Sequence, residues 1–125
     1  MEEKTLSECE ELVLKVIWAG DSPMTMQEIT ENVNQQYSRD WQTKTVTTFL
    51  SRIVQKGYLT AERKGRQFYY YPTISEEDYR RHEVIRFTDS WTSGRADVFL
   101  AAFLSSRKLT EDEKKRIRSM IDEVE

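Results

Sequence analysis

The chain has 125 residues, of which 38% are hydrophobic and 33% are charged, the size of about one domain with a modest apolar core. No apolar run of about 18 residues occurs, which excludes a membrane-spanning helix, and the acidic N-terminal segment lacks the apolar centre of a signal peptide. We therefore expect a cytoplasmic protein. Cys9 is the single cysteine, which excludes an internal disulfide, and without a CxxC or Cys/His cluster we expect no metal and no cofactor.

The net charge of −3 conceals an uneven distribution of charge along the chain. Counting Lys and Arg against Asp and Glu, residues 1–40 carry −6, residues 41–72 carry +5 and residues 73–125 carry −2. A basic segment between two acidic ones is typical of a surface directed at phosphates. An ordinary solvated face is the simpler alternative.

The first predicted helix begins at a capping box, in which Ser7 and Glu10 satisfy each other's backbone N–H groups. Its apolar residues fall on one helical stripe: Cys9, Leu12, Val13, Val16 and Ile17. The stripe predicts that Cys9 is a small core residue and not a reactive thiol. Trp18 closes the helix, and residues 19–23 break it.

The second predicted helix also begins at a capping box, formed by Thr25 and Glu28. Its apolar residues share one face, which we expect to be buried: Ile29, Val33 and Tyr37. Residues 38–41 then form a turn, so that the next helix follows after a short connection.

The third predicted helix is amphipathic and runs from Gln42 or Thr43 to about Lys56, where Gly57 can end it in the left-handed conformation. At about 100° per residue, its core face falls within one arc: Val46, Phe49, Leu50, Ile53 and Val54. The opposite face and its shoulders are polar: Lys44, Thr45, Thr47, Thr48, Ser51, Arg52 and Gln55. The helix contains no carboxylate, which would repel phosphate.

The residue types on this polar face indicate DNA binding. The β-branched run at residues 43–48 is a poor choice for a helix that serves stability alone. Threonine offers a hydroxyl to phosphates or bases and a methyl group to thymine, and Arg52 suits a bidentate contact with guanine. Lys44 can meet a phosphate together with the free N–H groups of the helix start. A polar face that meets only water is the alternative.

A hairpin is predicted next, with strands at Leu59–Arg63 and Gln67–Tyr71, a turn at residues 64–66 and an end at Pro72. Three helices followed by a two-stranded wing are the order of a winged helix-turn-helix. Residues 68–71 are all aromatic, and we expect them to pack in the core and the wing and not to stack on bases.

The turn of the hairpin is basic, which suits the flanking phosphates or a narrow minor groove, although charges also protect exposed sheet edges. With the third helix, it completes the candidate DNA-binding residues. They are Thr43, Lys44, Thr45, Thr47, Thr48, Ser51, Arg52, Arg63, Lys64 and Arg66.

The remaining residues are predicted to be helical. A long helix begins at Ser75 and reaches about Thr92, Gly94 interrupts it, and a short helix at residues 97–104 follows. Thr110 and Glu113 form a third capping box, from which a last helix runs to the C-terminus.

We interpret residues 1–73 as a winged helix-turn-helix domain and residues 74–125 as a helical dimerisation domain, in a mainly α fold with a small β-hairpin. The second region is too short to bury its own apolar side chains, so a two-fold homodimer is expected. The candidate dimerisation residues are Phe87, Trp91, Val98, Phe99, Phe103, Leu104, Ile117, Met120, Ile121 and Val124.

The sequence does not predict an enzymatic activity for this protein. His82 is the single histidine and lies among charged residues, which favours a surface position. The sequence contains no GxSxG, P-loop or HExxH motif. The acidic pairs at the helix starts are explained by the helix dipole.

The chain resembles the penicillinase and methicillin repressor family, BlaI/MecI/CopY, over nearly its whole length. The resemblance is carried by residues 12–18 (LVLKVIW), 44–52 (KTVTTFLSR), 56–59 (KGYL) and 65–66 (GR). It implies a homodimeric winged-helix repressor that binds a short inverted repeat of double-stranded DNA. By the same resemblance it controls antibiotic-resistance genes of the β-lactamase type, and residues 44, 45, 47, 48, 51 and 52 fall where family members touch DNA.

The resemblance also bears on how the repressor is released. In the β-lactam branch, a membrane sensor system triggers cleavage in the dimer domain, commonly at an Asn-Phe bond. The corresponding place here is Ala102-Phe103, which keeps the phenylalanine and lacks the asparagine. The copper branch carries paired CxC motifs, and this chain has none.

A protein-interaction module that docks a partner through its apolar C-terminal helices is the alternative function. Salt dependence distinguishes the two, because DNA binding weakens steeply with salt and apolar docking does not. A small-molecule sensor is a third option, for which the sequence shows no convergent polar pocket.

Overall fold

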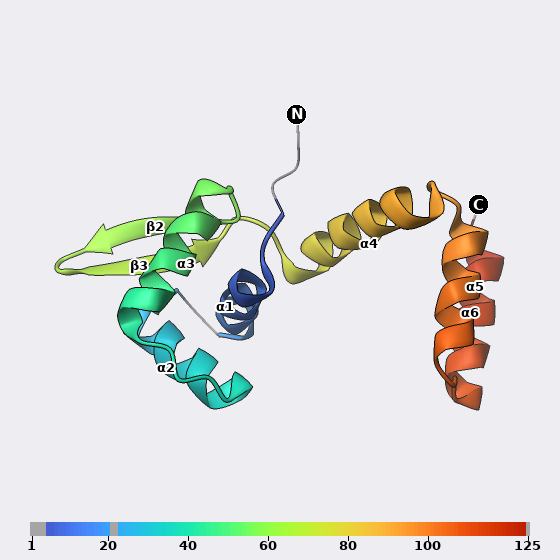
Figure 1. Ribbon diagram of the computed structural model, residues 1–125, viewed down its shortest axis with the longest axis horizontal. Coiled ribbons are helices and arrows are strands. Elements are labelled where there is room, and N and C mark those ends of the chain that lie inside the picture. The colour runs from blue at the N-terminus through green and yellow to red at the C-terminus, as the bar shows by residue number, and fades with distance from the viewer. Residues whose placement is uncertain (1–4, 21–22, 125) are drawn as a thin grey trace. The chain divides into compact units, whose positions relative to one another are not determined.

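The computed structural model describes residues 5–20 and 23–124, and its contacts divide the chain into two compact units, one up to Arg80 and one from Arg81 onward. Figure 1 shows the elements, which are α1 (Glu8–Ala19), β1 (Met24–Thr25), α2 (Met26–Tyr37), α3 (Thr43–Gln55), β2 (Leu59–Lys64), β3 (Gln67–Pro72), α4 (Glu76–Thr92), α5 (Ala96–Ser106) and α6 (Glu111–Glu123). The predicted fold class, a mainly α winged helix with a small β-sheet, is confirmed.

The predicted capping boxes begin three of the helices. In α1, Ser7 Oγ accepts the N–H of Glu10 at 3.2 Å, and Glu10 Oε1 accepts the N–H of Ser7 at 3.0 Å. The same reciprocal pairs begin α2 and α6, at Thr25 with Glu28 and at Thr110 with Glu113. Each box satisfies two backbone donors that a helix start leaves without a partner, which fixes where the helix begins.

The core of the first unit lies between α1, α2, α3 and the sheet. Its fully buried apolar side chains are Val13, Leu14, Val16, Ile29, Val33, Val46, Leu50, Ile53 and Leu59. The prediction that Cys9 is a core residue is wrong, because Cys9 is only half-buried, whereas Leu14 is fully buried. Cys9 lies on the same side of α1 as Val16 but in the first turn of the helix, and helical periodicity does not show how well each turn is covered.

The sheet has three strands in the order β1-β3-β2, one more than predicted. In the hairpin, Ala61 lies opposite Tyr70 and Arg63 opposite Phe68. Gly65 occupies the turn with φ +66°, a conformation that suits a residue without Cβ. Strand β1 pairs Met24 with Tyr70, but with two residues it is too short to show strand alternation in the sequence.

Helix α3 has the predicted bounds. Gln42 is its N-cap, and Gly57 follows the last turn with φ +93°. The predicted core face is confirmed at Val46, Leu50 and Ile53, which are buried, while Phe49 and Val54 are half-buried and pack against the core.

The start of α4 packs against α1 within the first unit. The indole N–H of Trp18 donates to the carbonyl oxygen of Ile74 at 2.9 Å, and the hydroxyl of Tyr79 donates to Glu11 Oε2 at 2.9 Å. The ring of Tyr79 lies 5.5 Å from the rings of both Trp18 and Tyr58. The division of contacts therefore falls within α4, and the domain boundary after Thr73 remains a prediction.

The second unit has a different character, because no described residue after Tyr79 is buried. Gly94, with φ +75°, separates α4 from α5 as predicted. Ring contacts run along the unit from Trp91 through Phe87 and Phe99 to Phe103. Among the described residues, no helix combines the length and apolar content needed to cross a membrane.

Candidate nucleic-acid interface

Helix α3 presents a continuous polar face at the surface. Its exposed members are Thr43, Lys44, Thr45, Thr48, Ser51, Arg52 and Gln55. Thr47 is half-buried and lies on the shoulder that faces α2. The face carries Lys44 and Arg52 and no acidic group, so nothing on it opposes the approach of a phosphate.

The threonine hydroxyls of this face are turned back onto the helix. Thr47 Oγ1 donates to the carbonyl oxygen of Thr43 at 2.8 Å and also contacts Met26 Sδ, and Thr48 Oγ1 donates to the carbonyl oxygen of Lys44 at 3.2 Å. Such bonds to the preceding turn are common for helical Ser and Thr. A contact from these hydroxyls to DNA therefore requires rotation about χ1, which threonine in a helix permits.

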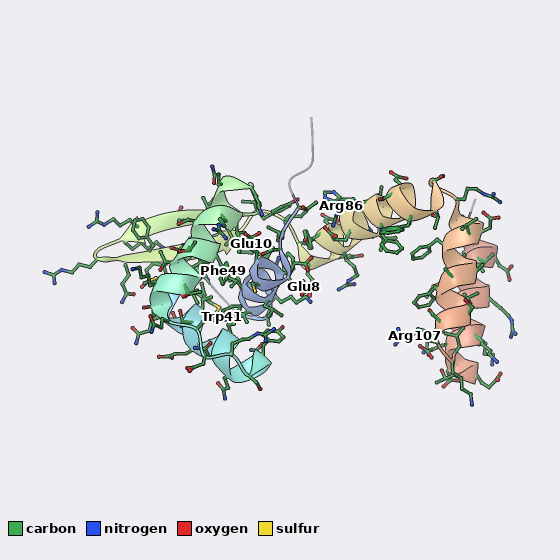
Figure 2. All side chains as sticks on the ribbon, viewed as in Figure 1. Glu8, Glu10, Trp41, Phe49, Arg86 and Arg107 are labelled. Carbon is green, nitrogen blue, oxygen red and sulfur yellow. The ribbon has the colours of Figure 1, made fainter. Side chains whose placement is uncertain are left out.

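A buried ion pair holds the C-terminal end of α3 against α1. Lys56 Nζ lies 2.6 Å from Glu10 Oε1, and the Glu10 side chain is only 2% exposed. Burial by itself would raise the pKa of Glu10, but hydrogen bonds from Lys56 and Ser7 hold that pKa below its ordinary 4.5. Figure 2 labels Glu10 between α1 and α3. Sequence reasoning assigned Glu10 only to the capping box and missed this contact.

The N-terminal end of α3 is fixed by a side-chain clamp on the connection from α2. Asn34 Nδ2 donates to the carbonyl oxygen of Trp41, and the N–H of Trp41 donates to Asn34 Oδ1, both at 2.9 Å. The ring of Trp41 lies 5.0 Å from that of Phe49 (Figure 2), and the guanidinium carbon of Arg39 lies 5.9 Å from the centre of the Trp41 ring. Both ends of α3 are thus held, which presets the position of its polar face.

The hairpin carries the other predicted cations, and all three are exposed: Arg63, Lys64 and Arg66. Arg63 Nε donates to the carbonyl oxygen of Gly65 at 3.1 Å, which ties one cation to the turn. Lys64 Nζ lies 5.6 Å from the ring of Tyr69 and 5.8 Å from that of Tyr71. The hydroxyl of Tyr71 raises the pKa of Lys64 above its ordinary 10.5, so Lys64 is charged at neutral pH.

The aromatic residues of the hairpin do not all pack as predicted. Tyr70 is buried, and burial raises its pKa, while Tyr69 and Tyr71 are half-buried on the other face. Phe68 is 48% exposed, so the expectation of core or wing packing is wrong for this residue. Phe68 is the second residue of β3, next to the turn of the hairpin, which extends beyond α3 in Figure 1.

The predicted dimerisation residues are spread over α4, α5 and α6. Those with the largest exposed fractions are Phe87, Trp91, Met120, Ile121 and Val124, and Val98, Phe103 and Leu104 are also exposed. Phe99 and Ile117 are half-buried. Ala102 and Phe103, the predicted cleavage position, are exposed in the middle of α5. Within the described chain, no three His, Cys, Asp or Glu side chains gather to hold a metal ion.

A three-helix unit with a basic wing and an acid-free helix face defines a winged helix-turn-helix DNA-binding domain. The chain matches the penicillinase repressor family model over residues 6–123 and belongs to that family. This is a family of DNA-binding transcriptional repressors and not of enzymes, so the predicted family and class are confirmed.

Relatives and solved structures agree with this assignment. The chain is 30% identical over 118 residues to the penicillinase repressor of Bacillus licheniformis, covering 94% of this chain and 90% of that protein. It is 26% identical over 124 residues to the methicillin resistance regulatory protein MecI of Mammaliicoccus sciuri, covering 98% of each.

Two solution structures are similar to part of this chain. One is the DNA-binding domain of the repressor BlaI, with a TM-score of 0.53, 35% identity and coverage of 62% of this chain and 92% of that chain. The other is monomeric Bacillus licheniformis BlaI in complex with the blaP half-operator, with a TM-score of 0.50 and the same identity and coverage.

Proposed function

We propose that this chain is a homodimeric transcriptional repressor that recognises an inverted-repeat operator. The observation that carries the proposal is the exposed, acid-free face of α3 beside the basic hairpin turn. In this arrangement α3 enters the major groove and the hairpin reaches the neighbouring backbone or minor groove. The structure of BlaI in complex with a half-operator, at 35% identity to this chain, supports a DNA-binding role for this domain.

The residues of the interface take different roles in this proposal. Arg52, near the C-terminal end of α3, reads a base through its guanidinium, and Lys44 meets a phosphate at the helix start. Thr45, Thr48 and Ser51 add hydroxyls and methyl groups to the same face. The hairpin cations extend the contact along the backbone, which adds affinity without sequence information.

Dimerisation through the second unit brings together two DNA-binding domains, one for each half-site of the operator. The exposed apolar side chains of α4 to α6 need a covering surface, and a second copy of the chain provides one with two-fold symmetry. Joining two weakly binding units raises operator affinity through effective concentration. The half-sites should lie about 10 base pairs apart, or a multiple of that spacing.

The relatives suggest which genes the repressor controls. They are a penicillinase repressor and regulators of methicillin resistance, so the proposed targets are genes for resistance to β-lactams. A membrane sensor system is the proposed upstream partner. Cleavage at Ala102-Phe103 would divide α5 and remove part of the apolar surface, which releases DNA by weakening the dimer.

Selection of bound DNA from a random duplex pool tests the proposal. The full chain should enrich an inverted repeat, and Arg52→Ala should relax specificity at one base pair in each half, by about 1–3 kcal/mol. Lys15→Ala removes an equal charge from the exposed side of α1 and should enrich the same sequence as the wild type. If no repeat rises above the salt-sensitive background, the repressor assignment is wrong.

A further inference from the structure

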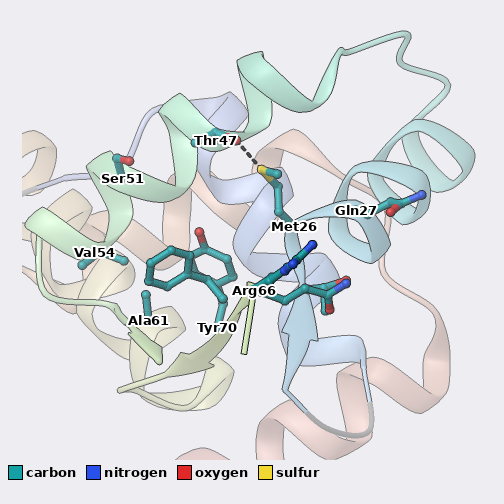
Figure 3. Close-up of a pocket in the computed structure, with 11 residues that line it drawn as sticks. Met26, Gln27, Thr47, Ser51, Val54, Ala61, Arg66 and Tyr70 are labelled. Atoms are coloured by element: carbon teal, nitrogen blue, oxygen red, sulfur yellow. Dashed lines mark hydrogen bonds between the residues drawn. The ribbon is translucent and has the colours of Figure 1, made fainter. Parts of the chain in front are cut away.

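A cavity of about 560 Å³ lies within the first unit, between α3, the hairpin and the start of α2 (Figure 3). Helix α3 contributes Thr47, Ser51 and Val54 to its wall, and α2 contributes Met26 and Gln27. Its volume is within the range of roughly 300–1,000 Å³ that small-molecule sites occupy. The cavity opens on the surface that carries the candidate DNA-binding residues.

One face of the hairpin gives this cavity a largely apolar wall. Ala61 and Tyr70 lie opposite each other on β2 and β3, and Phe68 lies two residues nearer the turn on the same face. Phe68 is 48% exposed although it is a large aromatic residue, and the side chain of Met26 points into the same space (Figure 3). Phenyl rings and thioethers have no positive charge and no hydrogen-bond donor for a phosphate group, so contact with the DNA backbone does not account for this part of the lining.

The other lining residues bring neutral polar groups and one charge. Hydroxyls come from Thr25, Thr47, Ser51 and Tyr70, amides come from Gln27 and Gln67, and Arg66 carries the only charge on the lining. No carboxylate lines the cavity, and within the described chain none pairs with Arg66. The complement of such a site is an apolar body that carries one anionic group, which a guanidinium binds through charge-assisted hydrogen bonds.

We propose that this cavity binds a small apolar carboxylate, an aromatic or branched-chain acid, and that the bound acid displaces DNA. The displacement rests on the proposed function, because Thr47, Ser51 and Arg66 line the cavity and are also candidate DNA contacts. An acid seated between α3 and the hairpin occupies these groups and adds a negative charge where the operator brings its phosphates. The cavity is then an inducer site that releases the repressor without cleavage.

Binding is tested on the full chain with 2-naphthoate as the probe and methyl-labelled methionine as the reporter. Met26 lines the cavity, and Met120, exposed on α6, reports nonspecific binding to the apolar second unit. Ala61→Leu fills the cavity, and Thr60→Leu places the same leucine side chain on the opposite face of the same strand. We expect a saturable shift of the Met26 methyl signal in the wild type and Thr60→Leu, and its loss in Ala61→Leu.

The role of the charge is tested with Arg66→Gln. This variant should bind 2-naphthoate up to about fivefold more weakly and the uncharged 2-naphthamide unchanged, since an exposed ion pair contributes little more. Arg63→Gln, which alters a cation outside the lining, should leave both affinities as in the wild type. The proposal is overturned if Met26 does not shift, if Ala61→Leu shifts equally, or if only Met120 responds.

Competition is tested on the selected operator. Added 2-naphthoate should raise the apparent Kd for DNA in the wild type and Thr60→Leu and leave it unchanged in Ala61→Leu. The inducer assignment is overturned if the operator Kd does not change at an acid concentration that saturates the Met26 shift. A wild-type chain that binds no operator refutes the proposed function, and the Met26 spectra still decide by themselves whether the cavity binds acids.

Discussion

The ion pair between Glu10 and Lys56 offers a direct test of how α3 is held in place. Lys56→Met keeps an unbranched side chain and removes the ammonium group, which leaves the Glu10 carboxylate, among the described residues, with the N–H of Ser7 as its donor. Breaking a fully buried pair costs about 3–5 kcal/mol. Because the Lys56 side chain is 25% exposed, we expect a smaller loss, about 2–3 kcal/mol of unfolding free energy.

The pH dependence of this loss has a defined sign. In the wild type the pKa of Glu10 is lowered, so its contribution is fully present above the ordinary 4.5 and is lost as pH falls through the folded-state pKa. In Lys56→Met the influences of Lys56 on the pKa of Glu10 are lost while burial, the largest single influence, remains, so we expect this pKa to rise and the charged carboxyl to destabilise the fold as pH rises. The difference between wild type and variant should therefore grow from pH ~4 to pH ~7.

Urea denaturation followed by tryptophan fluorescence over this pH range measures the effect. The double variant Glu10→Gln/Lys56→Met removes the unpaired charge and should recover about 1 kcal/mol or more at pH ~7. Lys15→Met removes an exposed cation from the same helix and should change stability by less than about 0.5 kcal/mol. A Lys56→Met variant as stable as the wild type, or a loss that does not vary with pH, would refute the reasoning.

Three further predictions concern the helix ends and the dimer. Gly57→Ala should lower the unfolding free energy measured by urea denaturation by about 1 kcal/mol, because φ is +93° and an added Cβ contacts no neighbour that could offset the backbone strain. Unchanged stability would contradict this prediction. Thr25→Ala removes the N-cap of α2 and should lower the unfolding free energy by about 1 kcal/mol and speed hydrogen exchange at the Glu28 amide. An unchanged exchange rate at this amide would contradict the prediction. Phe103→Asp should lower both the dimer fraction in sedimentation and operator affinity, whereas Ser119→Asp should alter neither; a monomeric variant with full operator affinity rules out the link.

Local patterns allowed much of the fold to be predicted. The capping boxes, the bounds of α3 and the hairpin turn depend on residues within a few positions of one another, so their signals are present in a short stretch of sequence. Strand β1 was missed because its pairing with β3 joins residues that are far apart in the chain. The pairing of Glu10 with Lys56, 46 residues away, was missed for the same reason.

The candidate site was predictable in part. Helical periodicity placed Lys44, Thr48 and Ser51 on the exposed face of α3, because the apolar residues between them must turn inward. The rotamers that turn the threonine hydroxyls back onto the helix depend on the folded backbone and carry no sequence signal. The cavity between α3 and the hairpin likewise arises from the packing of three elements, so the sequence showed no pocket.

No described side chain after Tyr79 is buried, so in the proposed homodimer the order of the second unit would depend on the amount of protein present. When a second copy supplies the missing surface, folding of the described residues beyond Arg80 and assembly become a single equilibrium that dilution shifts. Operator occupancy then falls faster than in proportion to the number of repressor molecules, because two copies are lost from each site together. Cell growth without fresh synthesis thus becomes a route to derepression that needs neither a ligand nor a protease.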